Sequence, residues 1–280
     1  MADLSRFALN QITTPKWSMG EAIEGLVRHG VPGIGAWRHF IDDYGTQRTA
    51  KHLKAAGLKV ACLCTGAWFN ATDEAGLSSA IDDNRAILDQ AAEIGSPCVV
   101  MVVGGLPDGS KDLAGQRQRV GDGLAELQAH AISTGVTMGL EPLHPMYAAE
   151  RSCLNTLKQA NDLCDELGEG FSTVVDVYHC WWDPDLKAEI TRGGGERVST
   201  FHICDWRVPT RNMRDRAMVG DGVADIAAIR SWLDDVEYDG PIELELFSEL
   251  DWWQRDPDEV VKIAIERCAP FVGPRTERTK

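Results

Sequence analysis

Four short segments of the chain each carry one residue of a type that binds metal ions. They are Glu141 in MGLEPLH, Asp176 in VVDVYH, His202 in TFHICD and Glu245 in IELELFSE. If each segment is a strand of one barrel, the four side chains converge at one mouth, where three carboxylates and an imidazole would hold a divalent cation. Burying three carboxylates without a cation costs several kcal/mol each, so a metal ion is the simplest compensation. Ligands rich in carboxylates favour one hard cation, with Mn²⁺ preferred and Mg²⁺ next. The imidazole ligand is also compatible with Zn²⁺ or Co²⁺.

Alternation along these segments predicts that the four side chains share the inner face of the barrel. Residues i and i+2 of a strand lie on the same face. Met138 and Leu140 therefore lie opposite Glu141, on an apolar face that suits contact with helices. Val175 and Val177 flank Asp176 in the same way, and the other two segments follow this pattern.

The elements that must position these residues form one module, a short apolar run followed by an amphipathic stretch, repeated eight times. The predicted strands are 6–13, 33–38, 59–66, 98–104, 137–144, 172–179, 198–206 and 242–248. The predicted helices are 20–28, 46–56, 77–94, 113–134, 155–167, 183–192, 224–234 and 257–268. Strict alternation of eight strands and eight helices predicts an α/β fold, the (β/α)8 TIM barrel.

Length and composition fit one such barrel. The chain has 280 residues and no Pro- or Ser-rich linker divides it. We therefore predict a single barrel over residues 1–272 and a flexible tail at 273–280, which is polar, charged and without periodicity.

Charge and hydropathy exclude several classes of function. A net charge of −15 repels a phosphate backbone, which argues against nucleic acid as a partner. The N-terminal residues lack the basic and apolar regions of a signal peptide, and no stretch approaches the roughly 20 apolar residues of a membrane helix. We expect a soluble, cytoplasmic protein without membrane contact, whose eight cysteines are reduced.

The segments GLEPLHP, VVDVYH, FHICD, GDG and YDGPIELELFS resemble the xylose isomerase-like barrel family. This family contains sugar isomerases and epimerases, inosose isomerases and dehydratases, and endonuclease IV. The resemblance implies that Glu141, Asp176, His202 and Glu245 bind one divalent ion. Glu245 is chosen over Glu243 because it directly precedes the Leu-Phe pair, and Glu243 is interpreted as a member of a core ion pair.

The resemblance also implies a function, a metal-dependent isomerase or epimerase of a ketose or ketocyclitol. Glu141 and Glu245 would transfer the proton through a metal-bound enediolate. The alternative is a dehydratase or lyase acting on a keto sugar or inosose, including elimination from 3-keto glycosides. A nuclease of the endonuclease IV type needs many more His ligands than the seven His of this chain can supply. A non-catalytic sugar sensor would not need to retain all four ligands.

Three further residues are predicted to bind the substrate. His179 follows Asp176 by three residues, His144 follows Glu141 by three, and Arg216 precedes the GDG turn. Each could instead be an ordinary structural or solvated group. Asp205, Arg207 and Arg211 are candidates of lower rank.

Tryptophans fall at or just beyond the ends of the predicted strands, among them Trp37, Trp68 and Trp206. Their rings would stack on the sugar or cyclitol ring, or would cover the mouth in an oligomer contact. We expect a homo-oligomer. The segment SELDWWQRD after the last strand is acidic and aromatic, which predicts an unphosphorylated substrate, although the Arg-rich loop before Gly220 could bind an anion.

Overall fold

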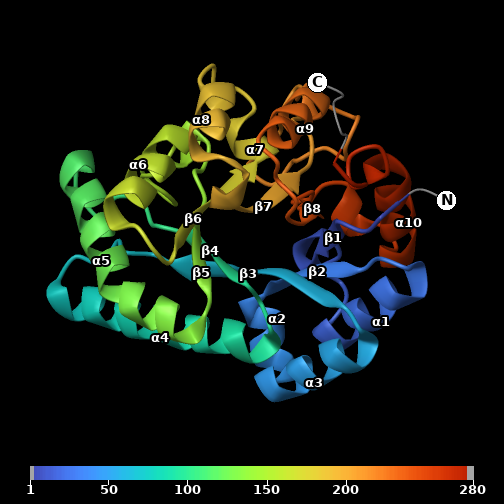
Figure 1. Ribbon diagram of the computed structural model, residues 1–280, viewed down its shortest axis with the longest axis horizontal. Helices are drawn as coiled ribbons and strands as arrows, with labels where there is room; N and C mark the ends of the chain where they lie inside the picture. Colours follow the sequence, from blue (N-terminus) through green and yellow to red (C-terminus); the bar gives the residue numbers. More distant parts are fainter. Residues whose placement is uncertain (1–2, 276–280) are drawn as a thin grey trace.

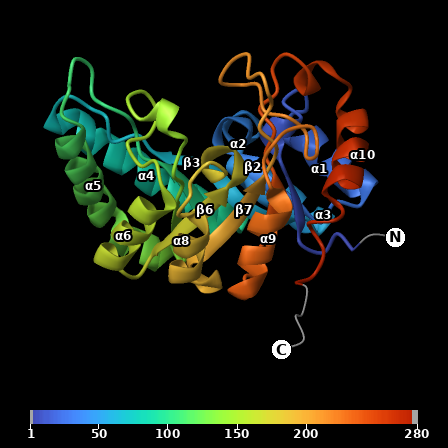
Figure 2. The same cartoon turned by 90° about the horizontal axis from the view of Figure 1, so that it is seen from above.

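The computed structural model describes residues 3–275. Eight parallel strands follow one another in sequence order, and β8 pairs with β1 to close the barrel. The (β/α)8 prediction is therefore confirmed. The strands are β1 (Phe7–Asn10), β2 (Gly33–Trp37), β3 (Lys59–Ala67), β4 (Cys98–Val102), β5 (Thr137–Leu140), β6 (Phe171–Asp176), β7 (Val198–Ile203) and β8 (Ile242–Leu244). Figures 1 and 2 show the helices surrounding these strands.

The helices that cover the barrel largely follow the predicted periodicity. They are α1 (Met19–His29), α2 (Arg38–Tyr44), α3 (Thr46–Ala56), α4 (Glu74–Ile94), α5 (Leu113–Thr134), α6 (Leu157–Leu167), α7 (Val177–Cys180), α8 (Leu186–Gly193), α9 (Ile226–Asp235) and α10 (Pro257–Cys268). Local chemistry sets their ends: Ser18 and Glu21 form a capping box on α1, and Gly30 ends it in the left-handed conformation. The short helices α2 and α7 were not predicted, because seven and four residues are too few to show a helical period.

Several strands end earlier than predicted. The predicted strand 137–144 stops at Leu140, and Pro142 beyond it has no N–H for a ladder. The predicted strand 172–179 stops at Asp176, whose Oδ1 accepts the N–H of Tyr178 at 2.6 Å and so begins α7. The predicted strands 6–13, 198–206 and 242–248 likewise stop at Asn10, Ile203 and Leu244. The candidate ligands thus lie at or just beyond the carboxyl ends of short strands.

The two ends of the described chain lie side by side. The N–H of Arg6, directly before β1, donates to the carbonyl of Val272 at 3.3 Å, in the segment after α10. Residues 276–280 of the predicted tail lie outside the described residues. Within residues 3–275 no cysteine is paired in a disulfide, and no helix is both long and apolar enough to cross a membrane.

Asn84 in α4 fixes the carboxyl end of β3 beside the barrel mouth. Its side chain accepts from the N–H of Ala67 and donates to the carbonyls of Ala67 (3.0 Å) and Ala80 (2.7 Å). Ala67 has φ of 86°, a conformation that needs such support in a residue other than glycine. We expect Asn84→Ala to lower the free energy of unfolding by about 1–3 kcal/mol, because buried backbone groups lose their partners. Urea unfolding would measure it, with the exposed Gln118→Ala as control; equal stability of the two variants would contradict the supporting role.

Candidate metal centre

The four predicted ligands meet at the carboxyl end of the barrel. Glu141 directly follows β5, Asp176 ends β6, His202 lies in β7 and Glu245 directly follows β8. One ligand atom of each lies within 4.8 Å of the others, and all four side chains are buried. His202 Nδ1 lies 3.1 Å from Glu141 Oε1, 3.8 Å from Glu245 Oε2 and 4.0 Å from Asp176 Oδ2.

The chemistry of this cluster fits a divalent cation. Glu141 Oε1 and His202 Nδ1 are buried 3.1 Å apart, and neither makes a hydrogen bond of acceptable geometry to any described residue. Leaving a buried polar atom unpaired costs about 1–3 kcal/mol, and a cation between the two atoms would satisfy both. Three carboxylates would neutralise the ion, and the set suits Mn²⁺ or Mg²⁺ while its imidazole also accepts Zn²⁺.

Arg216 is a second positive group against this cluster. It is 4% exposed, and its Nη1 donates to Glu245 Oε2 at 2.9 Å and to Asp176 Oδ2 at 3.0 Å. Its guanidinium lies over the rings of Tyr178 and Phe247, at 4.4 and 4.9 Å from their centroids. Burial raises the pKa of Asp176, and the charge of Arg216 opposes that rise. Arg216 therefore holds two carboxylates in place and helps to keep Asp176 ionised.

His179 lies one turn beyond Asp176 on α7 and faces the same centre. Its Nε2 lies 3.1 Å from Arg216 Nη2, and its Nδ1 accepts the backbone N–H of His144 at 3.1 Å. Burial, and then the charge of Arg216, lowers the pKa of His179 well below its ordinary value. A neutral imidazole therefore faces the cavity.

A cavity of about 560 Å³ opens above the cluster. Of the four ligands, only Glu141 and Glu245 line it, together with Arg216 and His179. Its walls are aromatic, from Trp37, Phe40, Tyr147, Phe247 and Trp253. A volume of this size suits a small-molecule ligand, and the combination of ring faces with a few polar groups suits a sugar or cyclitol.

Known proteins share this architecture. The model of the xylose isomerase-like TIM barrel family matches residues 23–269. The chain belongs to this family. An inosose isomerase of Bacillus velezensis is 24% identical over 280 residues, covering 96% of this chain and 97% of that protein.

Two solved structures of similar fold show how closely the barrel is shared. A protein of Sinorhizobium meliloti 1021 superposes on this xylose isomerase-like barrel with a TM-score of 0.95 and 42% identity, covering 97% of this chain and 100% of that one. A structure described as IOLI protein with a binding zinc atom superposes with a TM-score of 0.82 and 20% identity, covering 98% and 100%. At 20% identity the second likeness concerns the fold.

The predicted substrate-binding residues divide into two groups. His179, Arg216 and Trp37 line the cavity of this xylose isomerase-like barrel. His144 and Trp206 do not line it, and their rings stack on each other with centroids 5.0 Å apart. Trp206 also stacks on Tyr178 at 4.7 Å, and Tyr178 packs against the guanidinium of the cavity residue Arg216.

Trp68 lies away from the cavity wall and is 38% exposed. It contacts the guanidinium of Arg151, a cavity residue 5.7 Å from the ring centroids of both Trp68 and Tyr147. Within residues 3–275 no carboxylate lies within 4.0 Å of Arg151, so its charge is available at the cavity rim. Neither Tyr147 nor Arg151 was predicted as a site residue, because both lie in a loop without periodicity.

The lower-ranked candidates shape the loop between β7 and α9. Asp205 accepts the N–H groups of Gly220 and Ala224 at 3.1 and 2.9 Å. Arg207 and Arg211 both pair with the buried Asp215. Both arginines are therefore engaged in ion pairs within the loop, and neither lines the cavity.

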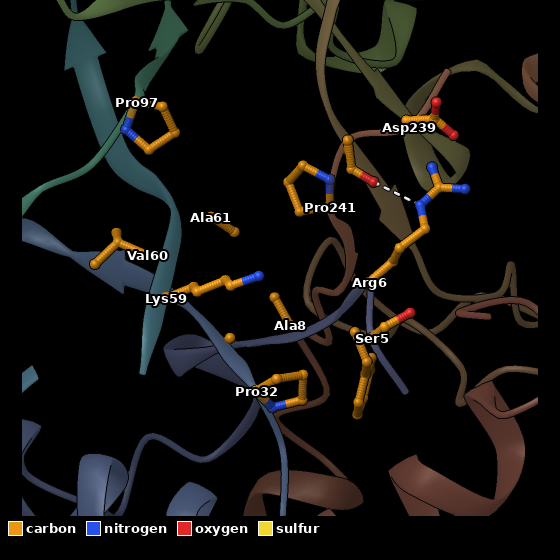
Figure 3. A pocket seen from close by; sticks show the side chains of 13 residues that line it. Ser5, Arg6, Ala8, Pro32, Lys59, Val60, Ala61, Pro97, Asp239 and Pro241 are labelled. Atoms are coloured by element: carbon orange, nitrogen blue, oxygen red, sulfur yellow. Dashed lines mark hydrogen bonds between the residues drawn. The ribbon is translucent and has the colours of Figure 1, made fainter. Parts of the chain in front are cut away.

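A smaller cavity of about 220 Å³ lies at the opposite end of the barrel (Figure 3). Pro32, Pro97 and Pro241 border it, and Arg6 Nε donates to the Gly240 carbonyl at 2.9 Å. The amino-terminal face of a TIM barrel serves stability, and catalytic groups gather at the carboxyl face. We therefore assign the chemistry to the larger cavity.

Proposed function

We propose that this protein is a divalent-metal-dependent isomerase or epimerase of an unphosphorylated ketose or ketocyclitol. One observation carries the proposal: only Glu141 and Glu245 belong both to the ligand cluster and to the cavity wall. They follow β5 and β8, which are three strands apart in the closed barrel. Two carboxylates thus reach a bound substrate from different sides. The inosose isomerase relative supports an enzyme that rearranges a sugar-like substrate.

These two carboxylates can move a proton at the carbon beside a carbonyl group. A divalent cation in the cluster would polarise that carbonyl and stabilise negative charge developing on its oxygen. One glutamate takes the proton, and the other returns one to the opposite face for epimerisation or to the neighbouring carbon for isomerisation; isomerisation also moves the hydroxyl proton to the former carbonyl oxygen. Arg216 donates towards the same oxygen-rich region, and the aromatic walls exclude water.

The unphosphorylated nature of the substrate is supported by the cavity lining. The segment after β8 contributes the rings of Phe247 and Trp253, where a phosphate site would need backbone amides, and Arg151 of the lining, which pairs with no described carboxylate, belongs to the segment after β5. Arg207 and Arg211 are already paired with Asp215.

Proton exchange in heavy water tests this proposal directly. Metal-loaded protein is mixed with a panel of ketoses and inososes in ²H₂O and followed by NMR and mass spectrometry. We expect deuterium at the carbon beside the carbonyl and a product that is an isomer of the substrate. An unsaturated product would show that the enzyme catalyses elimination and not isomerisation. Absence of deuterium exchange across the panel would contradict the proposal.

Removal of the metal ion is expected to destabilise the folded protein. A ligand at one hundred times its Kd stabilises the native state by about 2.7 kcal/mol. We expect a chelator to lower the thermal midpoint by several degrees and Mn²⁺ to restore it. His202→Ala, which removes the only imidazole ligand, should show no such restoration. Metal analysis of the purified protein would identify the bound ion, and a Mn²⁺-independent midpoint in the unaltered protein would contradict the metal site.

A further inference from the structure

The two ring nitrogens of His202 face different surroundings. Nδ1 faces the ligand cluster, with Glu141 Oε1 at 3.1 Å. Nε2 faces deeper into the barrel, where Glu243 Oε1 lies at 3.8 Å and Cys62 Sγ at 3.9 Å. Nδ1 is therefore the atom available to a cation, and a neutral imidazole that offers Nδ1 must carry its proton on Nε2.

Glu243 is a buried carboxylate in the layer below the cluster. It is 0% exposed and is the register partner of His202 across β7 and β8. Within residues 3–275 no Lys or Arg lies within 4.0 Å of it, so the predicted core ion pair has no permanent cation. Cys62 Sγ donates to Oε2 at 3.4 Å, and Asn10 Nδ2 donates to Oε1. Burying a carboxylate in this way is costly unless it serves as an acceptor for its neighbours.

Asn10 is held in the orientation that presents its donor to Glu243. Its Oδ1 accepts from the indole Nε1 of Trp37 at 2.6 Å and from the N–H of Ile12 at 3.2 Å. Because the oxygen is committed to these two donors, Nδ2 must point at the carboxylates, and it also reaches Glu245 Oε1 at 3.4 Å. The position of Glu243 is thus set by a chain of contacts that begins at the cavity wall.

Gly35 in β2 leaves the space that Glu243 occupies. A Cβ atom on Gly35 would overlap the carboxylate of Glu243. The backbone of Gly35 does not lie in the left-handed region, so the side chain of Glu243, and not the backbone, requires a glycine there.

We propose that Glu243 is a positioning residue that accepts the Nε2–H of His202 and so presents Nδ1 to the metal ion. A movement of about 1 Å brings the two atoms from 3.8 Å to hydrogen-bond distance. An acceptor behind a ligating histidine fixes both its tautomer and its ring orientation, and loss of such an acceptor weakens metal binding about 10–100-fold. The inference rests on the metal site of the proposed function.

Metal affinity tests the proposal without any substrate. The Kd for Mn²⁺ is measured by competition with a chelator, and Co²⁺ is added as a spectroscopic probe of the ligand field. We expect Glu243→Leu to weaken Mn²⁺ binding about 10–100-fold and to change the Co²⁺ spectrum. Glu243→Gln retains an acceptor oxygen and should stay within about tenfold of the unaltered protein, nearer to it than the Leu variant.

Stability of the metal-free variants separates positioning from a structural role. In metal-free Glu243→Leu, relief of the desolvation penalty of the carboxylate and loss of the acceptor for Asn10 Nδ2 and Cys62 Sγ oppose each other, so we expect a thermal midpoint within a few degrees of that of the unaltered protein. If Glu243→Leu does not fold, Glu243→Met carries the same expectation. Cys62→Ala removes the other neighbour of Nε2 and one of the donors to Glu243 but leaves the carboxylate itself, so its Mn²⁺ affinity should fall less than that of Glu243→Leu.

Three outcomes would overturn this inference. Unchanged Mn²⁺ affinity in Glu243→Leu, while the unaltered protein binds the ion, would remove the positioning role and leave the proposed function standing. Binding of two Mn²⁺ ions per chain in the unaltered protein, with one of them lost in Cys62→Ala, would indicate that Cys62, His202 and Glu243 form a second cation site instead. Failure of the unaltered protein to bind any divalent ion would remove the proposed function as well.

Discussion

Replacement of Glu245 by Gln is expected to lower kcat by about 10²–10⁴-fold, the range that a positioned acid or base contributes. Glu245 lines the cavity and belongs to the ligand cluster, so its carboxylate can reach the substrate. Gln retains the shape and one oxygen ligand, but it cannot take up a proton. The measurement is turnover, and deuterium wash-in, of whichever substrate the exchange panel identifies.

A matched control and a metal assay distinguish loss of proton transfer from loss of the metal ion. Glu266→Gln makes the same chemical change at an exposed residue of α10 that does not line the cavity, and it should leave kcat unchanged. Metal content of Glu245→Gln must be measured at saturating Mn²⁺, because loss of the ion would also abolish turnover. Undiminished kcat with full metal occupancy would reject the proton-transfer role of Glu245.

The barrel and the convergence of the four candidate ligands could be predicted because both depend on simple periodicity. A parallel strand has one inner face, so Glu141, Asp176 and His202 had to converge once their segments were assigned to neighbouring strands. The strand ends were predicted less well. Hydrophobicity continues past Asp176 into Val177 and Tyr178, although these residues form a helical turn.

The cavity wall was harder to predict because it comes from segments beyond the strands. Past the last ladder hydrogen bond, alternation no longer fixes where a side chain points. Trp37 still belongs to β2 and lines the cavity, whereas Trp68 and Trp206 follow their strands and point elsewhere. Tyr147 and Arg151 reach the cavity from a loop whose path depends on tertiary contacts, such as the Tyr147 hydroxyl donating to the Met213 carbonyl at 3.0 Å.

Replacement of Arg216 by Met is expected to separate catalysis from metal binding. The guanidinium lines the cavity and donates to Asp176 and Glu245, so its loss removes a donor that faces developing negative charge. Loss of one such donor lowers kcat by about 10²–10³-fold. The same change removes the two hydrogen bonds that orient Asp176 and Glu245, but it also removes a positive charge that repels a cation in the cluster. We expect the loss of repulsion to dominate, so the Kd for Mn²⁺ should be equal or lower. Both quantities are measured on the same preparation.

The expected fall in kcat without loss of Mn²⁺ affinity distinguishes a catalytic role of Arg216 from a structural one. If the guanidinium served only to hold Asp176 and Glu245 as ligands, metal affinity would fall together with kcat, and addition of Mn²⁺ would restore turnover. Arg207→Met is the control from the same loop, since Arg207 pairs with Asp215 and Asp251 and does not line the cavity. It should leave both kcat and the Kd for Mn²⁺ unchanged. A parallel loss of affinity and turnover in Arg216→Met would reassign Arg216 from the reaction to the assembly of the metal site.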